Sequence, residues 1–202
     1  ERTNTILGPH FQHIAGAEDV TDRSGDARIF YPPSAFGQSN LDLAMQLAAR
    51  VRELSQPGER VTEYYAGVGA IGLGLASRAA ALRLNELGEG SLTGLERGVA
   101  ELTTEQHGKV SIHRGSAAAH TNWVAQSDFV IADPPRKGLD LELTQALVRQ
   151  PPARFAYVSC DVASRERDAG TLLDAFRLSS LEAYDLFPHT EHVETLAVFE
   201  RR

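Results

Sequence analysis

The stretch Glu63-Tyr64-Tyr65-Ala66-Gly67-Val68-Gly69-Ala70-Ile71-Gly72 decides the fold. A short apolar run leads into three glycines with the spacing G-x-G-x-x-G, which is typical of a strand followed by a tight turn and a helix. Glycine there lets the backbone pass close to a ligand at the positive end of a helix. The pattern alone is weak, because any tight turn favours glycine. Its place at the start of an alternating series of strands and helices strengthens it.

The segments around this turn alternate between strand and helix patterns. We predict a helix beginning at Ser39 or Asn40 and further helices over 70–87, 98–107, 141–148 and 163–176. We predict strands over 61–65, 91–95, 109–113, 128–132, 155–159, 179–186 and 193–200. This alternation predicts an α/β fold with a doubly wound, mostly parallel, Rossmann-like sheet. The last two strands have no long helix between them, which predicts an antiparallel hairpin at one edge.

Length and composition fit one globular domain. The chain has 202 residues, of which 42% are hydrophobic and 23% charged, and a domain takes roughly 150 residues. A net charge of −7 means that a nucleic acid would be bound through a local basic patch or with help from elsewhere. No apolar run approaches a membrane span, no signal peptide is visible, and the missing initial Met suggests a piece of a longer chain.

The chain has a single cysteine, Cys160. It excludes an internal disulfide, a Cys-rich zinc site and an iron–sulfur cluster held by this chain alone. A reducing, cytoplasmic location is the simplest expectation. The segment Val158-Ser159-Cys160-Asp161 places the thiol at the carboxyl end of a predicted strand, where it is either a nucleophile or a buried small apolar residue.

Two further features belong to a cofactor site. Glu96 closes the predicted strand 91–95, where an acid would hold ribose hydroxyls. Asp133-Pro134-Pro135-Arg136-Lys137-Gly138 follows another predicted strand, and two prolines would hold the acid in a rigid segment at the edge where open α/β sheets bind ligands. The alternative is a proline-stiffened loop. Nicotinamide dinucleotides and S-adenosylmethionine both use this arrangement, so it indicates the class of cofactor site and not the cofactor.

The loop Phe187-Pro188-His189-Thr190-Glu191-His192-Val193-Glu194 lies between the last two predicted strands. It has donors for a metal ion, but no spacing typical of zinc. It could instead deliver one carboxylate as a general base, or be a hydrated turn. The remaining histidines show no partners in the sequence and are expected on the surface or in the core.

In this order, these segments resemble the RNA uracil-C5 methyltransferase family, which uses S-adenosylmethionine to make 5-methyluridine in tRNA and ribosomal RNA. The resemblance runs from about Phe30 to the end and includes Phe36-Gly37-Gln38-Ser39-Asn40. It implies that S-adenosylmethionine is bound by Gln38, Tyr65, Gly67, Gly69, Glu96 and Asp133. It further implies that Cys160 is the nucleophile and Glu194 the general base. Phe36 and Arg136 are expected near the substrate, no metal is expected, and the Arg167-Asp168 pair is expected to support the structure.

The resemblance also implies a division of the chain. Residues 1–37 would be the remnant of a preceding or central region, and residues 38–202 the S-adenosylmethionine-dependent methyltransferase domain. Family members carry an N-terminal RNA-binding barrel and often an iron–sulfur cysteine cluster, and neither is visible in this sequence. The expected partner is therefore an RNA, tRNA or rRNA, gripped with the help of a region outside this chain. No membrane partner is expected.

Three positions depart from the family pattern. Ala70 and Ser116 replace side chains expected to contact the cofactor, and Asp161-Val162 replaces Asn-Pro after the nucleophile. These replacements bear on cofactor affinity and rate. Three alternatives stay open: a methyltransferase acting at another atom, a degenerate non-catalytic module that binds RNA or protein, and an NAD-dependent oxidoreductase. The last has no hydride-transfer site downstream of the glycines.

Overall fold

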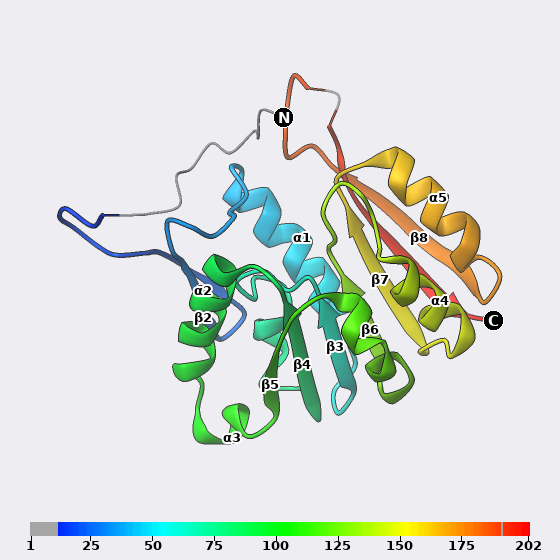
Figure 1. The fold of residues 1–202 in the computed structure, drawn as a ribbon, viewed down its shortest axis with the longest axis horizontal. Coiled ribbons are helices and arrows are strands. Elements are labelled where there is room, and N and C mark those ends of the chain that lie inside the picture. Colours follow the sequence, from blue (N-terminus) through cyan, green and yellow to red (C-terminus); the bar gives the residue numbers. More distant parts are fainter. Residues whose placement is uncertain (1–11, 191) are drawn as a thin grey trace.

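The computed structural model describes residues 12–190 and 192–202. Its main element is a seven-stranded sheet with the order β5-β4-β3-β6-β7-β9-β8 (Figure 1). The strands are β3 (Arg60–Tyr64), β4 (Ala81–Glu86), β5 (Val110–Arg114), β6 (Phe129–Ala132), β7 (Arg154–Ser159), β8 (Phe176–Tyr184) and β9 (Glu194–Arg201). β3 to β7 pair in parallel, whereas β9 is antiparallel to both β7 and β8. The predicted mostly parallel sheet with an antiparallel edge hairpin is confirmed.

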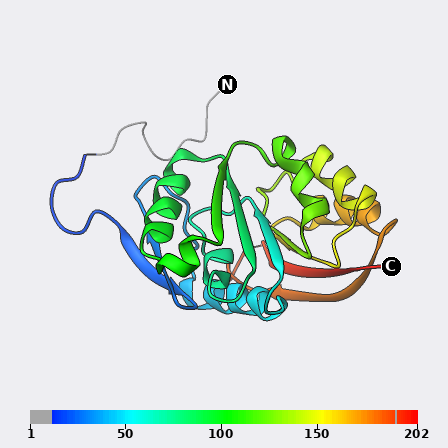
Figure 2. The same ribbon diagram turned by 90° about the horizontal axis from the view of Figure 1, so that it is seen from below.

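Helices cover both faces of this sheet. They are α1 (Leu41–Glu53), α2 (Glu89–Ala100), α3 (Thr104–His107), α4 (Leu141–Arg149), α5 (Val162–Leu172) and the 3-10 helices η1 (Gly72–Leu75) and η2 (Ala117–Gln126). One apolar cluster packs α1, α2 and η1 against the sheet, and a second packs η2, α4 and α5 against the opposite face. Figure 2 shows α4 and α5 on one side of the sheet and α1 on the other.

The start of α1 follows the predicted capping chemistry. The side chain of Asn40 accepts a hydrogen bond from the Leu43 N–H at 3.3 Å, which satisfies one of the free donors at the helix N-terminus. Leu47, Ala48 and Val51 form the buried face of the helix. The helix therefore begins where the sequence predicts.

The predicted helix over 70–87 is wrong. The chain makes only the short η1 there and then forms β4, in which Leu82 and Leu84 alternate into the core. Position 72 requires glycine, because a Cβ there would overlap the buried carboxylate of Glu63. Alanine and leucine favour a helix, but tertiary contacts override this preference.

The next two predictions fail as a consequence. The segment expected as a strand over 91–95 lies inside α2. The expected helix over 98–107 is interrupted: residues 98–100 are the end of α2 and residues 104–107 form the separate short α3. Assigning residues 81–86 to a helix displaced every following element by one until β5, where prediction and structure agree again.

Residues 20–31 form a hairpin that the sequence did not indicate. β1 (Val20–Ser24) and β2 (Ala27–Tyr31) pair in antiparallel fashion, separate from the main sheet. Ala27 and Ile29 are buried in the same apolar cluster as α1 and α2. No helix among the described residues is long and apolar enough to cross a membrane.

Candidate active site

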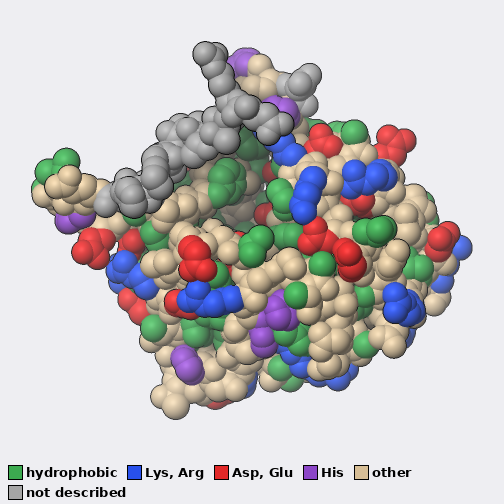
Figure 3. All heavy atoms as spheres, in the orientation of Figure 1, with side chains coloured by type: hydrophobic (Ala, Val, Ile, Leu, Met, Phe, Trp, Pro, Cys, Tyr) green, Lys and Arg blue, Asp and Glu red, His purple; other side chains and the backbone are tan. Residues whose placement is uncertain are grey.

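A cavity of about 840 Å³ opens at the carboxyl ends of the parallel strands. Its walls include the glycine turn after β3, the end of β4, the loop after β6 and the end of β7. Figure 3 shows a hollow in this face with hydrophobic, acidic and basic side chains around it. Open α/β sheets bind ligands at this edge, and ligand pockets take roughly 300–1,000 Å³.

The turn after β3 has the backbone that its glycines predict. Gly67 and Gly69 have φ values of 58° and 87°, in the left-handed region where glycine is favoured. Tyr65, which precedes them, also has a positive φ of 58°, a conformation that is costly for a tyrosine. A Cβ added at Gly67 would meet nothing within 4 Å, so this part of the turn faces open space in the cavity wall.

The acid at the end of the second strand is Glu86 and not Glu96. Glu86 is the last residue of β4, accepts the Gly67 N–H at 2.8 Å and the Leu87 N–H at 2.9 Å, and lines the cavity. Glu96 lies in α2, pairs with Arg114 at 2.5 Å and is not among the lining residues. The prediction that Glu96 ends the second strand is thus wrong, because the chain forms that strand ten residues earlier, as β4.

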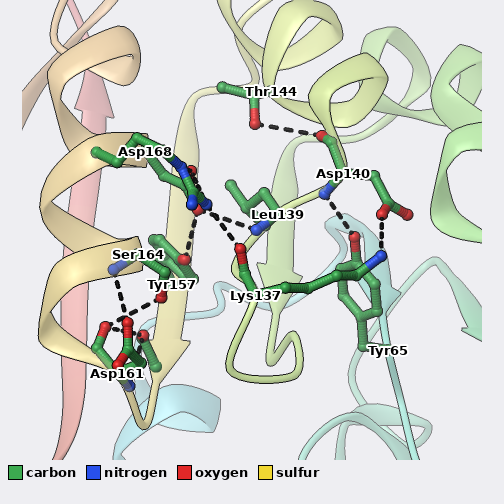
Figure 4. Close-up of polar contacts among 11 residues, drawn as sticks. Tyr65, Lys137, Leu139, Asp140, Thr144, Tyr157, Asp161, Ser164 and Asp168 are labelled. Carbon is green, nitrogen blue, oxygen red and sulfur yellow. Dashed lines mark hydrogen bonds and ion pairs between the residues drawn. The ribbon is translucent and has the colours of Figure 1, made fainter. Parts of the chain in front are cut away.

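The loop after β6 is fixed by a buried carboxylate. Asp168 of α5 accepts hydrogen bonds from the Leu139 N–H at 2.9 Å and from the Tyr157 hydroxyl at 2.8 Å (Figure 4). Arg167 donates to the Lys137 carbonyl at 2.7 Å and also contacts Asp168. The structural role predicted for the Arg167-Asp168 pair is confirmed, because it holds the loop that begins with Asp133.

Cys160 and Glu194 occupy neighbouring positions on paired strands. Ser159 ends β7 and pairs with Thr195 of β9, so Cys160 and Glu194 directly flank the last pair of this ladder. Both residues line the cavity, and so does Asp133, which directly follows the neighbouring strand β6.

Burial shifts the titration of these groups upward. It raises the pKa of the Asp133 carboxyl to about 7. It raises the pKa of Glu194 to about 8, and the charge of Asp133 adds to this shift. Burial likewise raises the pKa of the Cys160 thiol, with further contributions from Glu194 and Asp133. Removing a carboxylate charge would therefore favour the thiolate.

A carboxyl group that sequence reasoning missed lies beneath the glycine turn. Glu63 is buried, lines the cavity and accepts the Gly72 N–H at 3.0 Å. Burial raises the pKa of its carboxyl to about 8, with Asp133 as the next cause. The signal was present in the sequence, since an acid in a strand that leads into the glycine turn needs a partner inside the fold.

Most of the other predicted residues also reach the cavity, but Gly69 does not line it and packs against Leu73 and Leu95. Lining positions include Phe36, Gln38, Tyr65, Ala70, Ser116 and Arg136. The Oε1 of Gln38 and the Oε1 of Glu194 are buried there without a hydrogen-bond partner among residues 12–190 and 192–202. Buried polar atoms without partners are rare in folded proteins, and these two in one cavity fit a polar ligand.

The loop before β9 shows no sign of a metal centre in the part that the structure describes. Among those residues, no three His, Cys, Asp or Glu side chains lie close enough together to hold an ion. Glu191, one of the donors considered, lies outside the described residues. His192 lines the cavity beside Glu194.

The strand order, the glycine turn and the strand-end acid together define a Rossmann-like methyltransferase fold. The family model described as tRNA (Uracil-5-)-methyltransferase matches residues 98–202, and the chain belongs to this family.

Proteins of similar sequence or structure are RNA methyltransferases as well. An uncharacterized RNA methyltransferase of Protochlamydia amoebophila is 34% identical over 98% of this chain and 52% of its own length. One from Enterococcus faecalis is 29% identical over 100% of this chain and 45% of its own length. The tRNA (uracil-54, C5)-methyltransferase of Pyrococcus abyssi, solved with S-adenosyl-L-homocysteine, superposes with a TM-score of 0.80 at 32% identity, over 92% of this chain and 44% of that chain. The chain thus spans about half the length of these relatives.

Proposed function

We propose that this chain is the catalytic part of an S-adenosylmethionine-dependent RNA methyltransferase that methylates C5 of a uridine in tRNA or rRNA. The observation that carries the proposal is that Cys160 and Glu194, which flank the last pair of β7 and β9, both line the cavity, with Asp133 directly after the next strand. A methyltransferase acting on an exocyclic amine needs neither this thiol nor this carboxylate.

The cavity offers groups that suit the cofactor. Glu86 would accept hydrogen bonds from ribose hydroxyls, and the open side of Gly67 would let the ligand approach the backbone. The unpartnered Oε1 of Gln38 would accept a donor of the ligand. When bound, S-adenosylmethionine supplies an electrophilic methyl group.

The chain's own residues would supply the covalent steps. The Cys160 thiolate adds to C6 of the uracil, and the electrons of the C5–C6 double bond move toward C5 and O4, so that C5 becomes nucleophilic. C5 takes the methyl group from the sulfonium, with S-adenosylhomocysteine as the leaving group, and the Glu194 carboxylate then removes the C5 proton. The electrons of the C–H bond re-form the double bond, and the bond from sulfur to C6 breaks to return the thiolate. A target base would leave its stack to reach the thiol.

The raised pKa of Glu194, about 8, suits this role. A base with a higher pKa takes the proton more readily, but it must first be ionised. The Cys160 thiol, whose pKa is also raised, must lose its proton as well. The rate is therefore expected to rise between pH 7 and pH 9.

Two measurements test the proposal. Calorimetric titration with S-adenosylhomocysteine tests the pocket without RNA. The wild-type chain should bind this ligand, and the Asp133→Ala variant should bind it more weakly. RNA carrying 5-fluorouridine should then become covalently trapped on the wild-type chain, because fluorine at C5 cannot leave as a proton does. Cys160→Ala should abolish the trap and keep S-adenosylhomocysteine binding. Methylation of C5 by Cys160→Ala would contradict the mechanism, and a folded chain that binds no cofactor would favour a non-catalytic module.

A further inference from the structure

Three glycines of α2 form a track on which the backbone of the preceding segment lies. They stand four residues apart, at Gly90, Gly94 and Gly98, and so share one face of the helix. β2 and the segment after it cross this face. The track is unusual because glycine weakens a helix interior by roughly 1 kcal/mol relative to alanine, so three of them need a packing reason.

The approach is too close for any side chain. A Cβ added at Gly94 would overlap the carbonyl oxygen of Phe30 and lie 2.9 Å from Cδ of Pro32. A Cβ added at Gly90 would lie 2.5 Å from the carbonyl oxygen of Ser34. A Cβ at Gly94 would also lie 3.0 Å from Cγ1 of Val68 in the cavity wall. The closest obstacles are backbone atoms and a proline ring, so the segment 30–34 would have to move if α2 gained a methyl group here.

Side chains hold the same segment against α2. The ring of Phe30 is only 4% exposed, and the guanidinium carbons of Arg28 and Arg97 lie 5.0 Å and 4.9 Å from its centre. Arg28 and Arg97 also form ion pairs, with Glu101 and Asp19 respectively. These contacts hold β2 against the glycine face of α2.

The pressed segment leads directly into the cavity wall. The Ala35 N–H donates to the Pro32 carbonyl at 2.9 Å, and this turn delivers Phe36, Gly37 and Gln38 to the cavity. Gln38 carries a buried Oε1 without a partner in the described part of the chain. The position of this acceptor therefore depends on the depth at which residues 30–34 sit on α2.

We propose that Gly94 is a positioning residue for cofactor binding: it sets the depth of the 30–34 segment on α2 and thereby the place of the Gln38 side chain in the cavity. The inference rests on the proposed function, because the ligand is S-adenosylmethionine or S-adenosylhomocysteine. It adds a buried residue of α2 that does not line the cavity.

The test compares Gly94→Ala with Gly170→Ala. Gly170 lies in α5 and a Cβ there would meet nothing within 4 Å, so the control adds the same methyl group to a helix without crowding. Gly94→Ala should weaken S-adenosylhomocysteine binding by about tenfold, as expected when one hydrogen bond to a ligand is lost. Gly170→Ala should leave the affinity unchanged. Trp123, the single tryptophan, lies in η2, far along the chain from Gly94. Its fluorescence emission should therefore stay as in the wild type.

A double-variant cycle separates positioning from general damage. In a Gln38→Ala background, Gly94→Ala should cost less than about twofold, because the acceptor that it displaces is already gone. Equal tenfold losses in both backgrounds would overturn the proposal. If Gly94→Ala does not fold, Gly90→Ala repeats the cycle through its contact with Ser34.

A second readout needs no ligand. Hydrogen exchange of the amides in 35–38 should be faster in free Gly94→Ala than in free Gly170→Ala, because the turn at Ala35 is displaced. Unchanged exchange would overturn the inference even if the wild-type chain bound no S-adenosylhomocysteine. Absence of binding by the wild type, with faster exchange in Gly94→Ala, would instead contradict the proposed function alone.

Discussion

The hydroxyl of Tyr157 and the backbone N–H of Leu139 both donate to Oδ2 of Asp168, at 2.8 Å and 2.9 Å. One buried oxygen thus joins β7, which presents Cys160, to the loop that begins at Asp133. Asp168, which does not line the cavity, thus fixes the position of the Asp133 loop relative to the end of β7.

Asp168→Ala should therefore destabilise the fold. It leaves Arg167 without its charged partner and two donors without an acceptor, and removal of one member of a buried network costs about 3 kcal/mol. Urea unfolding at pH 7 would measure the loss. Asp174→Ala, at an exposed position just after α5, is the matched control and should stay within about 0.5 kcal/mol of the wild type. A loss for Asp168→Ala as small as that of the control would show that the network contributes nothing.

The reactivity of Cys160 should reflect the carboxylates around it. Because burial and the charges of Glu194 and Asp133 raise the pKa of the thiol, the midpoint of its alkylation by iodoacetamide should lie above the usual value of about 8.5. The chain has one cysteine, so the reaction reports on this site alone. Glu194→Gln removes a negative charge and should lower the midpoint by about half a unit or more.

Glu200→Gln serves as the control for this titration. Glu200 lies at the far end of β9, where it pairs with Arg177. Its replacement should leave the alkylation midpoint in place. A wild-type midpoint at or below 8.5 would contradict the expected effect of burial.

Gly67 and Gly58 allow backbone strain to be separated from ligand approach. Both have positive φ, 58° and 81°, and at neither would a Cβ meet an atom within 4 Å. Alanine at either position should cost about 1 kcal/mol of stability through strain. Only Gly67→Ala should also weaken S-adenosylhomocysteine binding, by about tenfold or more, because Gly67 lines the cavity and Gly58 precedes β3 at the other end of the sheet. Equal affinities of the two variants, measured by calorimetry, would show that the ligand does not approach this turn.

Much of the fold could be predicted because residues that interrupt strands, such as glycine and proline, stand at the ends of its short strands. The glycines after β3, the prolines after Asp133 and Asp161 after β7 each mark a strand end. The segment 70–87 could not be predicted in the same way. Its alanines and leucines favour a helix, but residues 81–86 pair as β4 between β3 and β5, a long-range arrangement that local preference does not contain.

The site could be predicted only in part. Cys160, Glu194 and Asp133 were singled out from their segments and from the family resemblance, but their meeting at one wall depends on the register of β7 and β9. That register is a long-range property, which periodicity within a segment does not contain. Glu86 was missed because the strand that ends in it was assigned to a helix.

The buried carboxyl of Glu63 should make stability depend on pH. Its folded-state pKa, about 8, lies above the ordinary value of 4.5, so the folded state holds the proton more tightly. The stability that this group contributes is present below pH 4.5 and is lost as the pH rises through 8. Glu63→Gln keeps an oxygen for the Gly72 N–H and cannot ionise. It should match the wild type within about 1 kcal/mol at pH 5 and exceed it by about 2 kcal/mol at pH 8.5, in urea unfolding. A variant less stable than the wild type at pH 8.5 would contradict this sign.

Glu86 and Glu96 give the sharpest comparison for the cofactor site. Both are acids of the same half of the chain. Glu86 ends β4 in the cavity wall, whereas Glu96 lies on α2 and pairs with Arg114 of β5. The side chain of Glu96 is 46% exposed. Glu86→Gln removes the charge that ribose hydroxyls would meet, and its amide nitrogen cannot accept from the backbone N–H groups that both carboxylate oxygens now bind, so it should weaken S-adenosylhomocysteine binding by about tenfold or more. Glu96→Gln removes one exposed ion pair and should leave the affinity within about twofold. Calorimetric titration of the two variants at one pH would decide. A loss confined to Glu96→Gln would restore the position that the sequence alone indicated and would mean that the ligand lies over α2 and not in the cavity.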